Sequence, residues 1–144
     1  MGVVYRRVMD LDPGLRARVV REPVARLATV RPDGLPHVVP VTFALDGDTI
    51  VTAVDQKPKT TTSLQRLRNI DAHPVASVVI DHYEDDWSRL WWVRADGAAR
   101  VEHAGAAREQ ALGWLVEKYA PYRQSRPRGP VIVVTVERWT AWAG

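Results

Sequence analysis

The sequence predicts a mainly β protein, a six-stranded antiparallel β-barrel with helices at its periphery. Two observations carry this prediction. Segments rich in Val and Thr are joined by short turns such as Pro32-Asp33-Gly34, which is typical of β-hairpins. The expected order of elements, helix, three strands, helix, two strands, helix, strand, also lacks the strand–helix alternation of a Rossmann sheet. We expect one domain over residues 1–144, with an N-terminal helix at 11–22 and the barrel at 24–139.

Composition excludes several classes of protein. Hydrophobic residues make up 46% of the sequence, which is enough for a packed core, and the absence of Cys excludes disulfides and thiolate chemistry. No apolar run approaches the roughly 20 residues that span a bilayer, and the first residues do not form a signal peptide. The net charge is only +3, without a Lys/Arg run. We therefore expect a cytoplasmic protein that binds neither membrane nor nucleic acid.

The first half of the chain predicts a helix followed by a three-stranded meander. Asp12 and Pro13 provide an N-cap and a first helical residue, and Leu15, Val19 and Val20 form the expected inward face. Turns at 31–34 and 46–48 contain the Pro, Asp and Gly that tight turns require. Strands are accordingly expected at 24–31, 36–45 and 50–54.

The second half predicts two helices and three strands. The helix after residue 60 ends before Pro74, because the residue that precedes a proline is pushed out of the helical region. The most periodic helix covers 105–120 and is ended by Pro121. Asp96-Gly97 predicts a β-bulge, since a Gly inside a strand often marks one. Strands are expected at 75–82, 89–101 and 131–139.

A basic segment joins the third strand to the helix that follows it. Lys57 and Lys59 precede Thr60, Thr61 and Thr62, at which the helical pattern begins. The free N–H groups and the positive dipole end of a helix favour an anion, and here two lysines add charge and the threonines add donors. The pattern indicates a phosphate cradle. The alternative is a solvated loop with a threonine N-cap.

Other combinations of reactive residues are weaker. The four histidines lie at 37, 73, 82 and 103 without the spacing of metal ligands, so no metal site is predicted. Asp85-Asp86 offers either a paired-carboxylate site or a solvated loop. Ser63 and Ser88 lack a nucleophile elbow. The sequence therefore predicts no catalytic residue.

Four stretches carry a resemblance to a known family. They are ARLATVRPDGLPHVVPVTF, the basic strand-to-helix segment, LRNIDAHPVASVVID and DDWSRLWWVRADGAARV. Together they resemble the pyridoxamine-5′-phosphate-oxidase-like (PPOX-class) superfamily of FMN-binding split barrels, over residues 25–139. The last stretch is similar to the actinobacterial branch of coenzyme F-420-dependent enzymes.

The resemblance implies a homodimer with two cofactor sites at the subunit interface. It places lysines and threonines of the basic segment on the cofactor phosphate, and backbone groups of the first strands at the edge of the ring system. Side chains of the fifth strand approach the same cavity. The residues expected at the cofactor are Lys57, Lys59, Thr60, Thr61, Val39, Pro40, Val41, Thr42, Trp92 and Arg94. Flavin oxidases of this fold carry a Ser-Arg-Lys cluster where this chain has Lys-Pro-Lys, so the choice of phosphate ligands stays open.

The function that the resemblance implies is hydride transfer between reduced coenzyme F-420, an 8-hydroxy-5-deazaflavin, and a small organic substrate. A deazaflavin carries the hydride itself, so the protein has to position the reactants more than to supply a base. Two alternatives stay open. One is an FMN-dependent oxidase or reductase. The other is a non-catalytic protein that carries a cofactor or haem on the same barrel.

Overall fold

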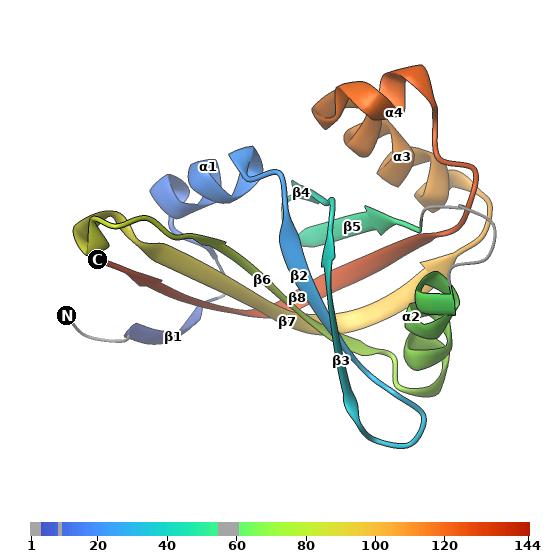
Figure 1. Ribbon diagram of the computed structural model, residues 1–144, viewed down its shortest axis with the longest axis horizontal. Helices are drawn as coiled ribbons and strands as arrows, with labels where there is room; N and C mark the ends of the chain where they lie inside the picture. Colours follow the sequence, from blue (N-terminus) through green and yellow to red (C-terminus); the bar gives the residue numbers. More distant parts are fainter. Residues whose placement is uncertain (1–3, 9, 55–60) are drawn as a thin grey trace.

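One curled antiparallel sheet dominates the computed structural model, which describes residues 4–8, 10–54 and 61–144 (Figure 1). The order of strands in this part of the chain is β3-β2-β6-β7-β8-β5-β4, with β1 paired to β8. Every pairing is antiparallel. The fold is therefore the mainly β half-barrel that the sequence predicts, with helices at its edges.

The elements have the following bounds. The strands are β1 Val4–Val8, β2 Ala25–Val30, β3 Pro36–Val41, β4 Ala44–Asp46, β5 Thr49–Ala53, β6 Val75–His82, β7 Trp91–Glu102 and β8 Val131–Ala143. The helices are α1 Pro13–Arg21, α2 Thr61–Ala72, α3 Ala106–Lys118 and α4 Ala120–Gln124, with a short 3₁₀ helix, η1, at Trp87–Arg89. No helix in the described ranges is long and apolar enough to cross a membrane.

The predicted strand 36–45 is two strands, and the predicted meander is wrong. β3 pairs with β2, whereas β4 pairs with β5, and these two strands lie at opposite ends of the sheet order. Thr42 and Phe43 carry the chain from one edge of the sheet to the other. We call these two residues the seam. The break follows from the curl of the sheet, because the strand must leave one edge before it can join the other.

Four further predictions are corrected. The sheet has eight strands where six were expected, because β1 was not anticipated and the 36–45 segment divides. Pro121 does not end the helical region but lies in the first turn of α4, where a missing N–H costs nothing. Val20 is 44% exposed and does not face the core. β7 begins at Trp91, after η1, and not at residue 89.

Local features predicted from turn and cap chemistry are confirmed. The Asp12 carboxylate accepts a hydrogen bond from the Leu15 N–H at 3.1 Å and caps α1. Gly34 has a φ of 88° in the β2–β3 turn, which favours glycine. The β7–β8 register shifts between Asp96 and Gly97, so the expected bulge is present, and the extra residue is Glu137 of β8.

Two apolar clusters fill the fold. The larger one lies inside the curl of the sheet and includes Leu27, Phe43, Ile80 and Trp139. The smaller one lies between α3 and strands β4, β5 and β8. Along β7, odd-numbered residues from Trp91 to Ala95 are buried and the even-numbered ones are only half-buried. The outer face of β7 therefore carries Trp92, Arg94 and Asp96.

Candidate cofactor site

The seam is joined to α4 by a pair of hydroxyl groups. The Thr42 Oγ lies 2.7 Å from the Tyr122 hydroxyl, and either of them can donate. Tyr122 is held in place by an edge-to-face contact with Tyr119, with ring centroids 5.5 Å apart. Two hydroxyls from segments far apart in the chain thus converge at the point where the sheet changes edge.

A half-buried arginine from α2 faces the same place. The Nε of Arg66 is buried and has no hydrogen-bond partner among the described residues. Burial lowers the pKa of Arg66, and the neighbouring Tyr122 phenol offsets part of that shift. A guanidinium stays charged in proteins, so a desolvated and unpaired one is compensated best by an anion. We call Thr42, Arg66 and Tyr122 the α2 corner.

The seam is supported from behind by α3 and its C-terminal residue. The Tyr119 hydroxyl accepts a hydrogen bond from the Phe43 N–H at 3.0 Å and lies 2.8 Å from the Pro23 carbonyl, to which it can donate. Lys118 places its Nζ 3.6 Å above the Phe43 ring. That Nζ is buried without a hydrogen-bond partner in the described part of the chain, and burial lowers the pKa of Lys118 to about 8.

The structure places the predicted cofactor residues in three groups. Lys57, Lys59 and Thr60 lie outside the described residues, and Thr61 is the first residue of α2. The β3 residues lie next to the α2 corner, since the strand leads directly into Thr42. The third group is the pair on β7.

β3 is an edge strand, so half of its backbone groups face away from β2. Successive residues of an antiparallel strand alternate between bonding the partner and facing outward. The ladder continues into the turn through the hydrogen bond from Arg31 N–H to the Leu35 carbonyl, so the odd-numbered residues bond β2. Pro40 has no N–H and fits an outward position. The Val38 and Pro40 carbonyls are therefore free to accept hydrogen bonds from a ligand at this edge.

Trp92 and Arg94 do not reach the α2 corner within one chain. Arg94 is aligned with Pro40 across the sheet through Arg26 and Val79. Three strand spacings separate the two residues, about 14 Å along the sheet. Trp92 lies two residues before Arg94 on β7 and is paired with Trp142 of β8.

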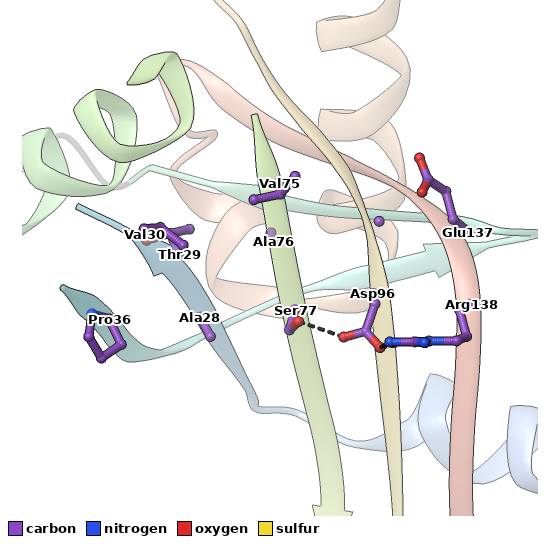
Figure 2. Close-up of a pocket in the computed structure, with 11 residues that line it drawn as sticks. Ala28, Thr29, Val30, Pro36, Val75, Ala76, Ser77, Asp96, Glu137 and Arg138 are labelled. Atoms are coloured by element: carbon purple, nitrogen blue, oxygen red, sulfur yellow. Dashed lines mark hydrogen bonds and ion pairs between the residues drawn. The ribbon is translucent and has the colours of Figure 1, made fainter. Parts of the chain in front are cut away.

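A pocket lies on the outer face of the sheet (Figure 2). Its volume is about 570 Å³, and small residues such as Ala28 and Ser77 form its floor. The Asp96 carboxylate accepts hydrogen bonds from the Ser77 hydroxyl at 2.5 Å and from Arg94 and Arg138 at 3.1 and 3.3 Å.

Asp96 is an ionised structural group and not a general acid. Burial acts to raise the pKa of Asp96, but the hydrogen bond from Ser77 and the charges and hydrogen bonds of Arg94 and Arg138 outweigh that effect, so the pKa is lowered. Its oxygens are already occupied by three donors. The outer pocket therefore offers shape and an arginine, and Asp96 does not serve in it as an acid for proton transfer.

The sequence analysis included Thr42 among the cofactor residues but missed Arg66 and Tyr122. Arg66 was given no role in its helix, and Tyr122 lies in a segment expected to be a loop. Their roles depend on contacts between segments up to 80 positions apart. In the ranges described, no three His, Cys, Asp or Glu residues are grouped to hold a metal ion.

The sequence of this chain matches one known protein family. The sequence matches the family described as pyridoxamine 5′-phosphate oxidase over residues 11–143. The comparison with curated proteins finds no match.

Solved structures share the architecture at low sequence identity. HutZ, the heme storage protein of Vibrio cholerae, is 16% identical with a TM-score of 0.70, over 94% of this chain and 95% of that chain. A heme-binding protein of Mycobacterium smegmatis is 24% identical with a TM-score of 0.71, over 95% and 56%. A FAD-binding protein of Mesorhizobium loti is 19% identical with a TM-score of 0.66, over 91% and 94%. At these identities the likeness shows the fold alone.

Proposed function

Because this chain belongs to the pyridoxamine 5′-phosphate oxidase family, we propose that it is an oxidoreductase which holds a phosphate-bearing deazaflavin at the α2 corner. The observation that carries the proposal is the half-buried Arg66 guanidinium near the Tyr122 hydroxyl, with an Nε that has no hydrogen-bond partner among the described residues. Coenzyme F-420 is the proposed cofactor, because the DDWSRLWWVR stretch resembles enzymes that use it. The proposed substrate is a small organic hydride acceptor.

The residues present fit a phosphate group. Arg66 supplies a charged, planar donor set, and Thr42 and Tyr122 supply hydroxyl donors. Lys57 and Lys59, with Thr60 and Thr61, are the further ligands that we propose from the basic segment leading into α2. A phosphate bound here satisfies the buried donor that the described residues leave without a partner.

The ring system is proposed to lie along the free edge of β3. Within the predicted stretch Val39, Pro40, Val41 and Thr42, the outward carbonyl of Pro40, together with that of Val38, accepts hydrogen bonds at its edge. Since Trp92 and Arg94 lie about 14 Å from this edge in the same chain, we assign them to the site of a second subunit. The proposed protein is thus a homodimer in which each site uses both chains.

The chemistry divides between cofactor and protein. A bound deazaflavin supplies the hydride, which it carries on carbon. The chain's own residues bind its phosphate, align its ring against a rigid strand and cover its face. Among the described residues near the corner there is no nucleophile beside a base, which agrees with a protein that contributes position rather than proton transfer.

The proposal is tested by titrating purified protein with oxidised coenzyme F-420 and with FMN, followed by fluorescence. Arg66→Met removes the buried charge and should weaken binding about 10- to 100-fold, the range for a hydrogen bond to a charged group. Arg66→Lys should recover part of the affinity. Arg68→Met is the matched control, because Arg68 is an exposed arginine of the same helix. Equal affinities for wild type and Arg66→Met contradict the phosphate assignment, and preference for FMN replaces the deazaflavin.

A haem carrier is the second candidate function. Two structures of this fold come from proteins named for heme binding and storage. His37 of β3 is half-buried, and its Nδ1 has no partner among the described residues, so an imidazole is available at the same strand. Haem binding is measured from the Soret band. If His37→Ala shifts that band and abolishes saturation, while coenzyme F-420 and FMN do not bind, the carrier function replaces the oxidoreductase.

A further inference from the structure

A second pocket, lined by basic residues, lies between α3 and the loop that follows α4. Its volume is about 470 Å³. We call it the arginine pocket, and its lining residues are Arg108, Gln124, Ser125, Arg126, Pro127 and Arg128. None of these residues belongs to the α2 corner, so the pocket requires an explanation of its own.

Arg108 holds the two sides of the pocket together. Its side chain is only 14% exposed, and it donates from Nε to the Gly129 carbonyl and from Nη2 to the Arg128 carbonyl, both at 3.1 Å. These two bonds hold the loop against the first turn of α3. Glu109 accepts from Arg108 at 2.8 Å and from Arg126 at 2.9 Å. The guanidinium groups of Arg108 and Arg126 are thus held by hydrogen bonds, whereas Arg128 is an exposed residue that lines the pocket.

The charge in the pocket is unbalanced. Three arginines face one carboxylate, that of Glu109, which leaves two positive charges. The N-terminus of α3, at Gly105, has no side-chain cap, so the positive end of the helix dipole adds to the potential around Arg108. Arg123 does not contribute, since it donates to the Val116 and Glu117 carbonyls at the other end of α3.

We propose that the arginine pocket binds an oxyanion with two or more negative charges, carried on phosphate or carboxylate groups. Planar guanidinium groups match both kinds of oxyanion with paired hydrogen bonds. The pocket is small and closed on one side by α3, which suits a compact polyanion better than an extended nucleic-acid strand. The excess of two charges sets the preference for a dianion over a monoanion.

The pocket is connected to β5 through a backbone hydrogen bond. The Val54 N–H donates to the Pro130 carbonyl at 3.0 Å, so the loop of the pocket adjoins the end of β5. The anion can therefore come from two sources: the distal charged groups of a long cofactor held at the corner, or a separate small anion. The first source rests on the proposed function, and the second does not.

The test uses sodium tripolyphosphate as the probe in calorimetric titrations at low salt. In the Arg126→Gln/Arg128→Gln variant its dissociation constant should rise at least about tenfold, as expected when charged donors are removed. Arg31→Gln/Arg100→Gln is the matched control, because it removes two exposed, ion-paired arginines elsewhere. The control should change the constant by less than twofold. Equal weakening of both variants, or of neither, overturns the proposal.

A second arm separates the sources with coenzyme F-420 prepared with and without its oligoglutamate tail. If the pocket receives the tail, the pocket variant loses affinity for the tailed coenzyme and keeps its affinity for the tail-free one. If the pocket receives a separate anion, both coenzymes bind the variant normally, and tripolyphosphate binds protein saturated with either. If no coenzyme binds at all, the proposed function fails, and the tripolyphosphate result alone decides the pocket.

Discussion

At the scale of single residues, two half-buried cations near the seam differ in how their charge can be relieved. Arg66 and Lys118 each leave a buried nitrogen without a hydrogen-bond partner in the described structure. Arginine keeps its proton at any physiological pH, so the buried charge of Arg66 is best compensated by a bound anion. Lysine loses its proton when burial is costly enough, and the pKa of Lys118 is lowered to about 8.

Lys118 therefore predicts a dependence of stability on pH. Its pKa in the folded chain lies below its ordinary value of 10.5, because burial disfavours the charged amine more than Glu22 favours it. Between these two values the unfolded chain binds a proton that the folded chain has released, so the free energy of unfolding rises with pH. Lys118→Met should be more stable than wild type at pH 7, with a smaller difference at pH 9.5.

Urea unfolding of both proteins at the two pH values checks this expectation. The difference between wild type and variant isolates Lys118 from the other groups that titrate in the range. A constant difference between pH 7 and pH 9.5 contradicts the shifted pKa.

Residues whose role is local could be predicted from the sequence, and those whose role depends on distant contacts could not. The Asp12 cap and Gly34 follow from bonds or angles within a few positions. Tyr122 meets Thr42 across 80 positions, and Arg66 acquires its environment only when α2 packs. The lysines of the basic segment remain a prediction, because they lie outside the described residues.

At the scale of elements, the bulge between β7 and β8 fixes how the longest strands pair. A Cβ added to Gly97 would lie 2.0 Å from the Thr135 carbonyl oxygen, a backbone atom that cannot move aside. Gly97→Ala should reduce the free energy of unfolding by about 2–4 kcal/mol through this clash. Gly113 of α3 is the control, since a Cβ there meets nothing within 4 Å.

Gly113→Ala should instead add about 0.5–1 kcal/mol, because alanine is the better helix former. Chemical denaturation of the two variants measures both the expected loss of stability in Gly97→Ala and the expected gain in Gly113→Ala. Equal effects of the two substitutions would mean that the close approach of β7 and β8 does not constrain position 97.

The elements themselves were predicted well where periodicity or turn chemistry defines them. The β2–β3 hairpin, α1, α2, β6 and β7 appear where expected, within a few residues. The division of 36–45 was missed because its composition is uniformly suited to a strand. Only the pairing of β3 and β4 with different partners reveals the break, and pairing is not a local property.

At the scale of the whole molecule, the sheet leaves apolar side chains exposed near its β3 edge. Val38 is 61% exposed, Leu35 56% and Val75 50%. Val38 and Val75 flank the floor of the outer pocket, in line with the small residues of β2 and β6. An exposed group of this kind suits an interface, which agrees with the homodimer that we propose.

Val38→Glu should raise the dissociation constant of that dimer tenfold or more, because a charge would be buried against the partner. Val20→Glu places the same substitution on α1, at a position that is also exposed, and should leave the constant unchanged. Sedimentation velocity at several concentrations gives both values. A monomer at all concentrations, or equal constants for the two variants, contradicts an interface at this face.

The fold class followed from the sequence because hairpin turns and β-rich segments define it, and the family match over residues 11–143 agrees with it. The position of the proposed site followed only in part: Thr42 and the start of α2 were expected there, but Arg66 and Tyr122 were not, because the proposed site lies where the chain crosses between the two edges of the curled sheet. That crossing is a consequence of the number of strands and their twist, which no single segment encodes.

A ligand bound at the seam should also raise the melting temperature of the protein. Two residues connect the opposite edges of the sheet, so a molecule bound against Thr42 contacts the link between them and stabilises the folded chain over the unfolded one. A compound present at a hundred times its dissociation constant then adds about 2.7 kcal/mol to the resistance to melting. In a chain of this length that is a gain of several degrees in Tm. A library of acceptors and coenzymes can therefore be ranked by melting temperature alone, before any reaction is known.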